Sequence, residues 1–111
     1  MSNLKRIILE MGTGNDLYGK NYTKAAKRAV QDAIHHSSLT LFKSLDIDPM
    51  KMQIELNLAA QEPEKIDLEE VANELPYGQV TPKAILGGLN VHDEVTDRTS
   101  VIVNALSLIH I

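Results

Sequence analysis

Apolar and polar residues alternate strictly from Met50 to Leu58. This period of two predicts a strand with one face on the core and the other face polar. The last stretch, 100–111, is apolar with little alternation, which indicates a strand buried on both faces. We therefore expect it in the centre of a sheet or against another copy of the chain.

Two further segments have the residue types of strands. Residues 4–11 carry Ile7, Ile8 and Leu9, and the glycine-rich stretch 12–21 that follows is predicted to be a loop. Residues 79–91 form a strand candidate interrupted by Pro82 and by Gly87-Gly88, so a bulge or a close backbone approach is expected there. The polar residues 92–99 then predict a hairpin turn.

Helical spacing occurs twice. Between residues 22 and 38 an apolar stripe, mostly alanine, recurs every three or four positions and predicts a helix that can approach a sheet closely. Asn21 or Thr23 can cap its start. A second helix is predicted after Asp67, which has Glu70 at the capping-box position and Pro76 beyond the helix end.

The element order is therefore β-α-β-α-β-β in a single α+β domain over 1–111. It predicts a four-stranded mixed sheet with two helices on one face. The other face is polar on 50–58 but apolar on 100–111, and no further element is left to cover it. We expect such a face to find a partner in a homo-oligomer.

Composition and charge exclude several classes of function. The net charge is −4 and the basic residues do not gather into one block, so nucleic acid is not expected as a partner. The absence of cysteine excludes disulfides, thiolate catalysis and zinc–thiolate sites. The sequence has neither a leader core of ordinary length nor an apolar run of about 20 residues, so we expect a cytoplasmic protein without membrane spans.

The glycine-rich stretch is the first place to look for chemistry. From Gly14 to Lys20 it follows the nucleotide-binding phosphate-loop pattern, but Asn21 replaces the hydroxyl residue that holds magnesium, and Asp16 would repel phosphate. Two interpretations stay open. The glycines supply positive φ angles in a tight connection, or the backbone amides of the loop and helix start bind an anionic or carbonyl group.

The second interpretation assigns a role to each polar residue nearby. Glu10 and Asp16 are the acid–base candidates. The ligand-binding candidates are Gly12, Gly14, Gly19, Lys20, Thr23, Lys24 and Arg28. The histidines at 35, 36, 92 and 110 show no ligand spacing, so no metal site is predicted and no cofactor is identified.

Two runs, with Ser38-Leu39 after them, carry a family resemblance: Glu10-Met11-Gly12-x-Gly14-x-Asp16-x-x-Gly19 and Thr23-Lys24-Ala25-Ala26-x-Arg28-Ala29-Val30-x-x-Ala33-Ile34. In them the chain resembles a small family of conserved hypothetical proteins, known by a locus-tag name of the Lin type and without established function. More remotely, the element order is similar to the chorismate-mutase-like fold. That fold includes reactive-intermediate deaminases and ring-opening amidohydrolases for cyclic amides, and the likeness implies a trimer with sites in the clefts between subunits.

Two functions remain as hypotheses. The first is a small-molecule-binding protein or enzyme whose site lies at a subunit interface, formed by residues 12–19 and the start of the first helix. The second is a structural or regulatory homo-oligomer in which the same residues only build subunit contacts. The sequence leaves open whether the protein is an enzyme.

Overall fold

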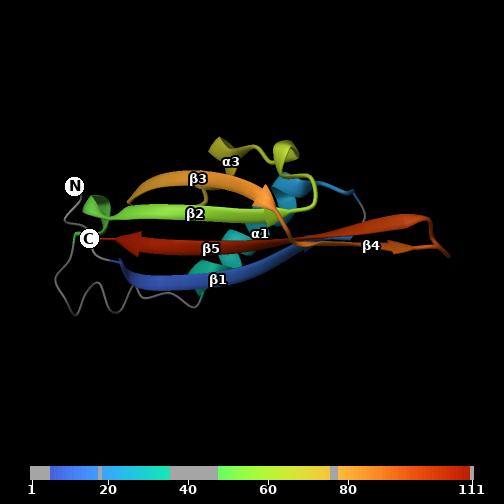
Figure 1. The fold of residues 1–111 in the computed structure, drawn as a ribbon, viewed down its shortest axis with the longest axis horizontal. Helices are drawn as coiled ribbons and strands as arrows, with labels where there is room; N and C mark the ends of the chain where they lie inside the picture. The colour runs from blue at the N-terminus through green and yellow to red at the C-terminus, as the bar shows by residue number, and fades with distance from the viewer. Residues whose placement is uncertain (1–5, 18, 36–47, 76–77, 111) are drawn as a thin grey trace.

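A computed structural model describes residues 6–17, 19–35, 48–75 and 78–110 of the chain (Figure 1). The strands are β1 (Arg6–Asp16), β2 (Gln53–Ala60), β3 (Gln79–Leu86), β4 (Leu89–Asp93) and β5 (Arg98–His110). The helices are α1 (Tyr22–His35) and α3 (Leu68–Ala72), with 3₁₀ turns η1 (Pro49–Lys51) and η2 (Pro63–Lys65). The predicted continuation of the first helix to residue 38 lies outside the described residues.

The strands form one mixed sheet in the order β1-β5-β2-β3, and β4 also pairs with β5. β5 runs antiparallel to β1, β2 and β4, whereas β2 and β3 are parallel. The prediction that the last strand is central is confirmed, as is the mixed α+β sheet with two helices. The predicted number of four strands is wrong, because residues 79–91 form two strands instead of one.

The division falls at Gly87-Gly88, where the chain steps inward by one strand position. β3 lies beside β2, but β4 lies beside β5 in line with β2 and beyond its end. Gly88 has a φ of +63°. A Cβ on this residue would overlap the carbonyl oxygen of Ile102 and would lie 2.8 Å from the carbonyl oxygen of Ala59. Only glycine fits both conditions. The expected close backbone approach is therefore confirmed.

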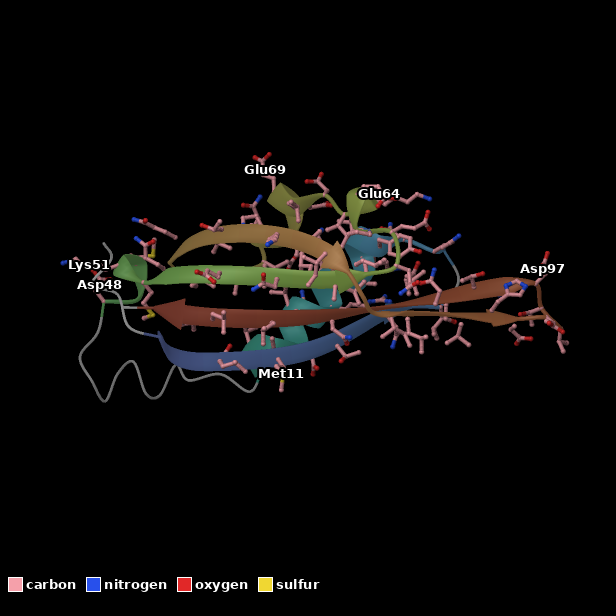
Figure 2. The ribbon with its side chains drawn as sticks, in the orientation of Figure 1. Met11, Asp48, Lys51, Glu64, Glu69 and Asp97 are labelled. Carbon is pink, nitrogen blue, oxygen red and sulfur yellow. The ribbon has the colours of Figure 1, made fainter. Side chains whose placement is uncertain are left out.

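Beyond this step, β4 and the first residues of β5 extend from the body as a two-stranded arm (Figure 1). The molecule is accordingly long and flat, with principal extents of 53 × 29 × 18 Å. Asp97 marks the far tip of the arm (Figure 2).

The core lies between the sheet and the helices. The alternation predicted for 50–58 appears in β2, whose residues Ile54, Leu56 and Leu58 are buried while Gln53 and Glu55 are exposed. Figure 1 shows α1 behind the sheet, so the face toward the viewer carries no described helix. We call this second face of β1, β5, β2 and β3 the open face.

The start of α3 follows its predicted capping signal. The Asp67 side chain accepts a hydrogen bond from the Glu70 amide at 3.1 Å, and Ile66 and Val71 are both buried beside this turn. The helix ends at Ala72, earlier than predicted, although Leu75 is still buried in the core. The cap and the apolar contacts therefore fix this short element against the sheet.

The prediction of a loop from residue 12 is wrong. Gly12 and Gly14 lie inside β1 and face α1. A Cβ on Gly14 would overlap the Ala25 carbonyl oxygen and the Ala29 amide nitrogen. These glycines therefore allow strand and helix to meet along the alanine stripe of α1, and among the described glycines only Gly78 and Gly88 have positive φ.

Candidate functional site

The connection from β1 to α1 is organised by Asp16, which is buried. Its Oδ2 accepts hydrogen bonds from the Gly19 amide at 3.1 Å and the Asn21 amide at 2.9 Å. Its Oδ1 lies 3.9 Å from both the Lys24 Nζ and the Arg28 Nη1. Both carboxylate oxygens thus hold the connection and the first turns of α1 in place.

The start of α1 uses the two predicted capping residues differently. The Asn21 Oδ1 accepts a hydrogen bond from the Lys24 amide at 3.0 Å, so Asn21 is the N-cap. The Thr23 hydroxyl accepts a hydrogen bond from the Asp67 amide at 2.9 Å and donates one to the Lys65 carbonyl oxygen at 3.4 Å. Thr23 therefore ties α1 to the segment that precedes α3.

The three predicted cationic residues lie together along this part of the chain. The side chains of Lys20, Lys24 and Arg28 are 50%, 54% and 47% exposed. Arg28 also donates a hydrogen bond to the Asn15 carbonyl oxygen at 2.7 Å, and the Asp32 side chain accepts one from the Thr13 amide at 2.9 Å. Side chains of α1 thereby protect the free edge of β1 from pairing with another strand.

The two acid–base candidates are not brought together. Glu10 lies in the middle of β1, not at its end, and it is buried opposite Ser107 of β5. Asp16 lies six residue positions further along β1, which corresponds to about 20 Å. The two predicted acid–base residues therefore belong to different places: Glu10 is a buried carboxylate within the sheet, and Asp16 holds the connection from β1 to α1.

Sequence reasoning missed a polar cluster around Tyr22, which is 2% exposed. Its hydroxyl donates a hydrogen bond to the Glu62 carboxylate at 2.8 Å and accepts one from the Asn90 amide at 2.7 Å. The Lys65 Nζ lies 2.9 Å from the same carboxylate, and the Lys20 Nζ lies 3.6 Å from it. The cluster joins α1, η2 and β4 at the root of the arm.

The protonation of this cluster follows from its contacts. Burial raises the pKa of the Tyr22 hydroxyl. The hydrogen bond from Lys65 lowers the pKa of Glu62, and the same contact raises the pKa of Lys65. Tyr22 therefore stays protonated near neutral pH and acts as a hydrogen-bond donor, which suits a link between elements better than a catalytic base.

A groove of about 520 Å³ lies on the open face. Its residues come from two neighbouring rows across the sheet: Thr13, Asn104, Ala59 and Ile85 in one row, and Met11, Leu106 and Asn57 in the other. The size and the largely apolar lining are typical of small-molecule sites. Met11, one of the residues that line the groove, stands out from β1 (Figure 2).

The polar groups of the groove are hydroxyl and amide groups, with the Asp32 carboxylate of α1 at its rim. The Thr13 hydroxyl donates a hydrogen bond to the Asn104 Oδ1 at 3.2 Å, and Asn57 lies diagonally across from Asn104. Both amides can donate and accept hydrogen bonds. The available signal was that Asn57 and Asn104 are amides at positions of β2 and β5 whose neighbours along the strand are apolar. We missed it because such alternation is also the pattern of a solvated face.

Neither a metal centre nor a membrane span is found in the part of the chain that the structure describes. No three histidine or carboxylate side chains there come together as possible metal ligands. No helix there is long and apolar enough to cross a bilayer.

The comparison with protein families identifies the chain. Residues 6–109 match the model of a family described as conserved hypothetical protein, Lin0512_fam. The chain belongs to the Lin0512 family. This confirms the resemblance carried by the runs 10–19 and 23–34.

This Lin0512 family member shares its fold with a crystal structure from Nostoc punctiforme, described as an FtsZ-like protein of unknown function. The two chains are 35% identical, the match covers 97% of this chain and 96% of the other, and the TM-score is 0.86. No curated protein matches the chain. The family is thus established, and no specific activity comes with it.

Proposed function

We propose that this chain is a small-molecule-binding protein whose site is the groove of the open face, at an interface between copies of the chain. The observation that carries the proposal is the convergence of Thr13, Asn57 and Asn104 within an apolar groove of about 520 Å³. A few placed polar groups on an apolar surface give a ligand both affinity and orientation. The site thus moves from the predicted loop at 12–19 to the sheet on the other side of β1.

The chemistry of the groove favours an uncharged ligand with hydrogen-bond donors and acceptors. Asn57 and Asn104 each offer both kinds of group, and the Asp32 side chain at the rim already accepts a hydrogen bond from the Thr13 amide. A flat cyclic amide presents matching edges on a small apolar body. The proposed chorismate-mutase-like relationship supports the same ligand class and a site between subunits, and we place the protein in the cytoplasm.

Replacing Asn57 with leucine should weaken binding of hydantoin, a small cyclic amide, by about tenfold or more, because it removes a hydrogen-bonding group from the lining of the groove. The measurement is a titration followed by the ¹H–¹⁵N signals of the Asn side chains. Gln53→Leu is the matched control, since Gln53 is an amide on the open face of the same strand but outside the groove. Its affinity should equal that of the unaltered chain.

The proposal fails if hydantoin leaves the Asn57 and Asn104 signals unchanged, or if both leucine variants bind it equally. An open face that assembles but admits no ligand would instead support the structural or regulatory homo-oligomer.

A second candidate is a small anion held by the side chains of Lys20, Lys24 and Arg28 at the start of α1. The observation that favours it is the half-exposed state of all three cations beside the start of α1. Titration with inorganic phosphate distinguishes the two sites. Phosphate bound at the start of α1 would shift the backbone amide signals of Gly19 and Lys24. It would leave the side-chain amide signals of Asn57 and Asn104 unchanged.

A further inference from the structure

The open face differs from the rest of the surface in how little charge it carries. Among the strand side chains on it that the structure describes, only Glu55 on β2 and Lys83 on β3 are charged, and Asp32 of α1 reaches the rim of its groove. The remaining positions are amides, hydroxyls and apolar side chains, of which Leu9, Met11 and Ile85 are 47%, 67% and 42% exposed. We propose that this face binds a second copy of the chain, with Glu55 of one copy facing Lys83 of its neighbour.

The two charges are placed so that the face is complementary to itself. Glu55 pairs with Thr81, whereas Lys83 pairs with Asn57, so the two charges are diagonal neighbours at about 8 Å. Within the described part of the chain, neither forms an ion pair shorter than 4.0 Å. Two open faces can meet so that each Glu55 lies over the Lys83 of the other copy. An arrangement that placed Glu55 over Glu55 and Lys83 over Lys83 would bring like charges together and is disfavoured.

The size and polarity of the face suit the same partner. The open face lies on the broad side of the molecule, whose overall extents of 53 × 29 Å also include the arm, and each partner of a stable interface buries roughly 800 Å². Asn and Gln side chains can pair with each other across such a contact because each both donates and accepts. Its balanced charges also matter, since the chain carries a net −4 and its other surfaces would repel a second copy.

The helix side, by contrast, carries many charges of both signs: Glu64 and Glu69 are exposed near η2 and α3 (Figure 2), and Lys20, Lys24 and Arg28 are half-exposed along α1. This contrast within one small molecule is what identifies the open face as the association surface. The groove of the proposed function lies in the same face. The association does not require that the groove hold a ligand, and its test measures mass alone.

The experiment is sedimentation equilibrium of the full chain and three variants. The unaltered chain should form an oligomer, and Glu55→Lys should raise its dissociation constant by about tenfold or more, because each contact then brings two bases together. The double variant Glu55→Lys with Lys83→Glu restores the opposite charges and should recover the original affinity. Glu64→Lys changes the net charge equally on another surface and should have no effect.

Circular dichroism of every variant confirms that the monomer is folded. A monomeric wild-type chain would overturn the proposal. So would an oligomer that Glu55→Lys leaves intact, or a double variant that stays as weak as the single one. Recovery of assembly by the double variant cannot arise from a general loss of stability, and it would therefore establish the contact between these two residues.

Discussion

Replacing Gly14 with alanine should destabilise the fold by about 3 kcal/mol or more, which is the upper part of the range for overpacking a core. The added methyl group would overlap the Ala25 carbonyl oxygen and the Ala29 amide nitrogen. Both are backbone atoms of α1, so no side chain can turn aside to make room. The whole helix would have to move away from β1, and contacts along the alanine stripe would be lost with it.

Urea unfolding followed by circular dichroism measures this effect. Gly19→Ala is the control, because a Cβ there lies 3.0 Å from the Asp16 Oδ2 and meets nothing else closer than 3.9 Å. A small movement of one side chain accommodates it, and we expect a change below about 1 kcal/mol. Equal losses at both positions would contradict the close-packing role of Gly14 and favour a loop in which all three glycines act alike.

Replacing Asp16 with alanine should destabilise the protein by about 2 kcal/mol, because two charge-assisted hydrogen bonds to the Gly19 and Asn21 amides are lost. The estimate stays at this level because both amides belong to exposed residues, so water can replace part of the interaction. The free energy of unfolding in urea is again the measurement.

Asp16→Asn isolates the charge. Its side-chain oxygen can still accept from the two amides, while its NH₂ group faces Lys24 and Arg28 in place of the carboxylate. We expect it to retain more than half of the stability that alanine loses. If asparagine were as destabilising as alanine, the 3.9 Å contacts with Lys24 and Arg28 would carry more of the stability than the amide hydrogen bonds.

The parts of the fold that followed from the sequence are those that a local pattern decides. Alternation from Met50 to Leu58 identified β2 and its buried face, and the continuous apolar run at the end identified β5 as central. Asp67 and Glu70 located the start of α3 because a helix cap is a contact between residues three apart. In each case the interaction that forms the element lies within a few residues.

The extent of β1 was not decided locally. Gly12 and Gly14 weaken a strand by themselves, and the compensating contact comes from Ala25, Ala29 and Ala33 of α1. The sequence contained both halves of this contact, since the alanine stripe already indicated a close approach. It did not show that the alanine stripe of the helix packs against Gly12 and Gly14. The same glycines were therefore interpreted as a loop.

The candidate site was missed for a related reason. Thr13, Asn57 and Asn104 come from three strands and meet only because β5 lies between β1 and β2. Tyr22, Glu62 and Asn90 likewise meet only at the root of the arm. The residues that were predicted, among them Asp16, Thr23 and Arg28, are close in sequence, and the structure uses them to hold the connection and the edge of β1.

The central claim is that the open face is where this protein binds its partner, and methionine oxidation by hydrogen peroxide tests it most directly. Met11 on the open face and Met50 in η1 are 67% and 61% exposed in the single chain, whereas Met52 is fully buried. In the assembled protein Met11 should oxidise several-fold more slowly than Met50, and the two rates should converge in the Glu55→Lys variant. Equal rates for Met11 and Met50 in the assembled protein would contradict the claim.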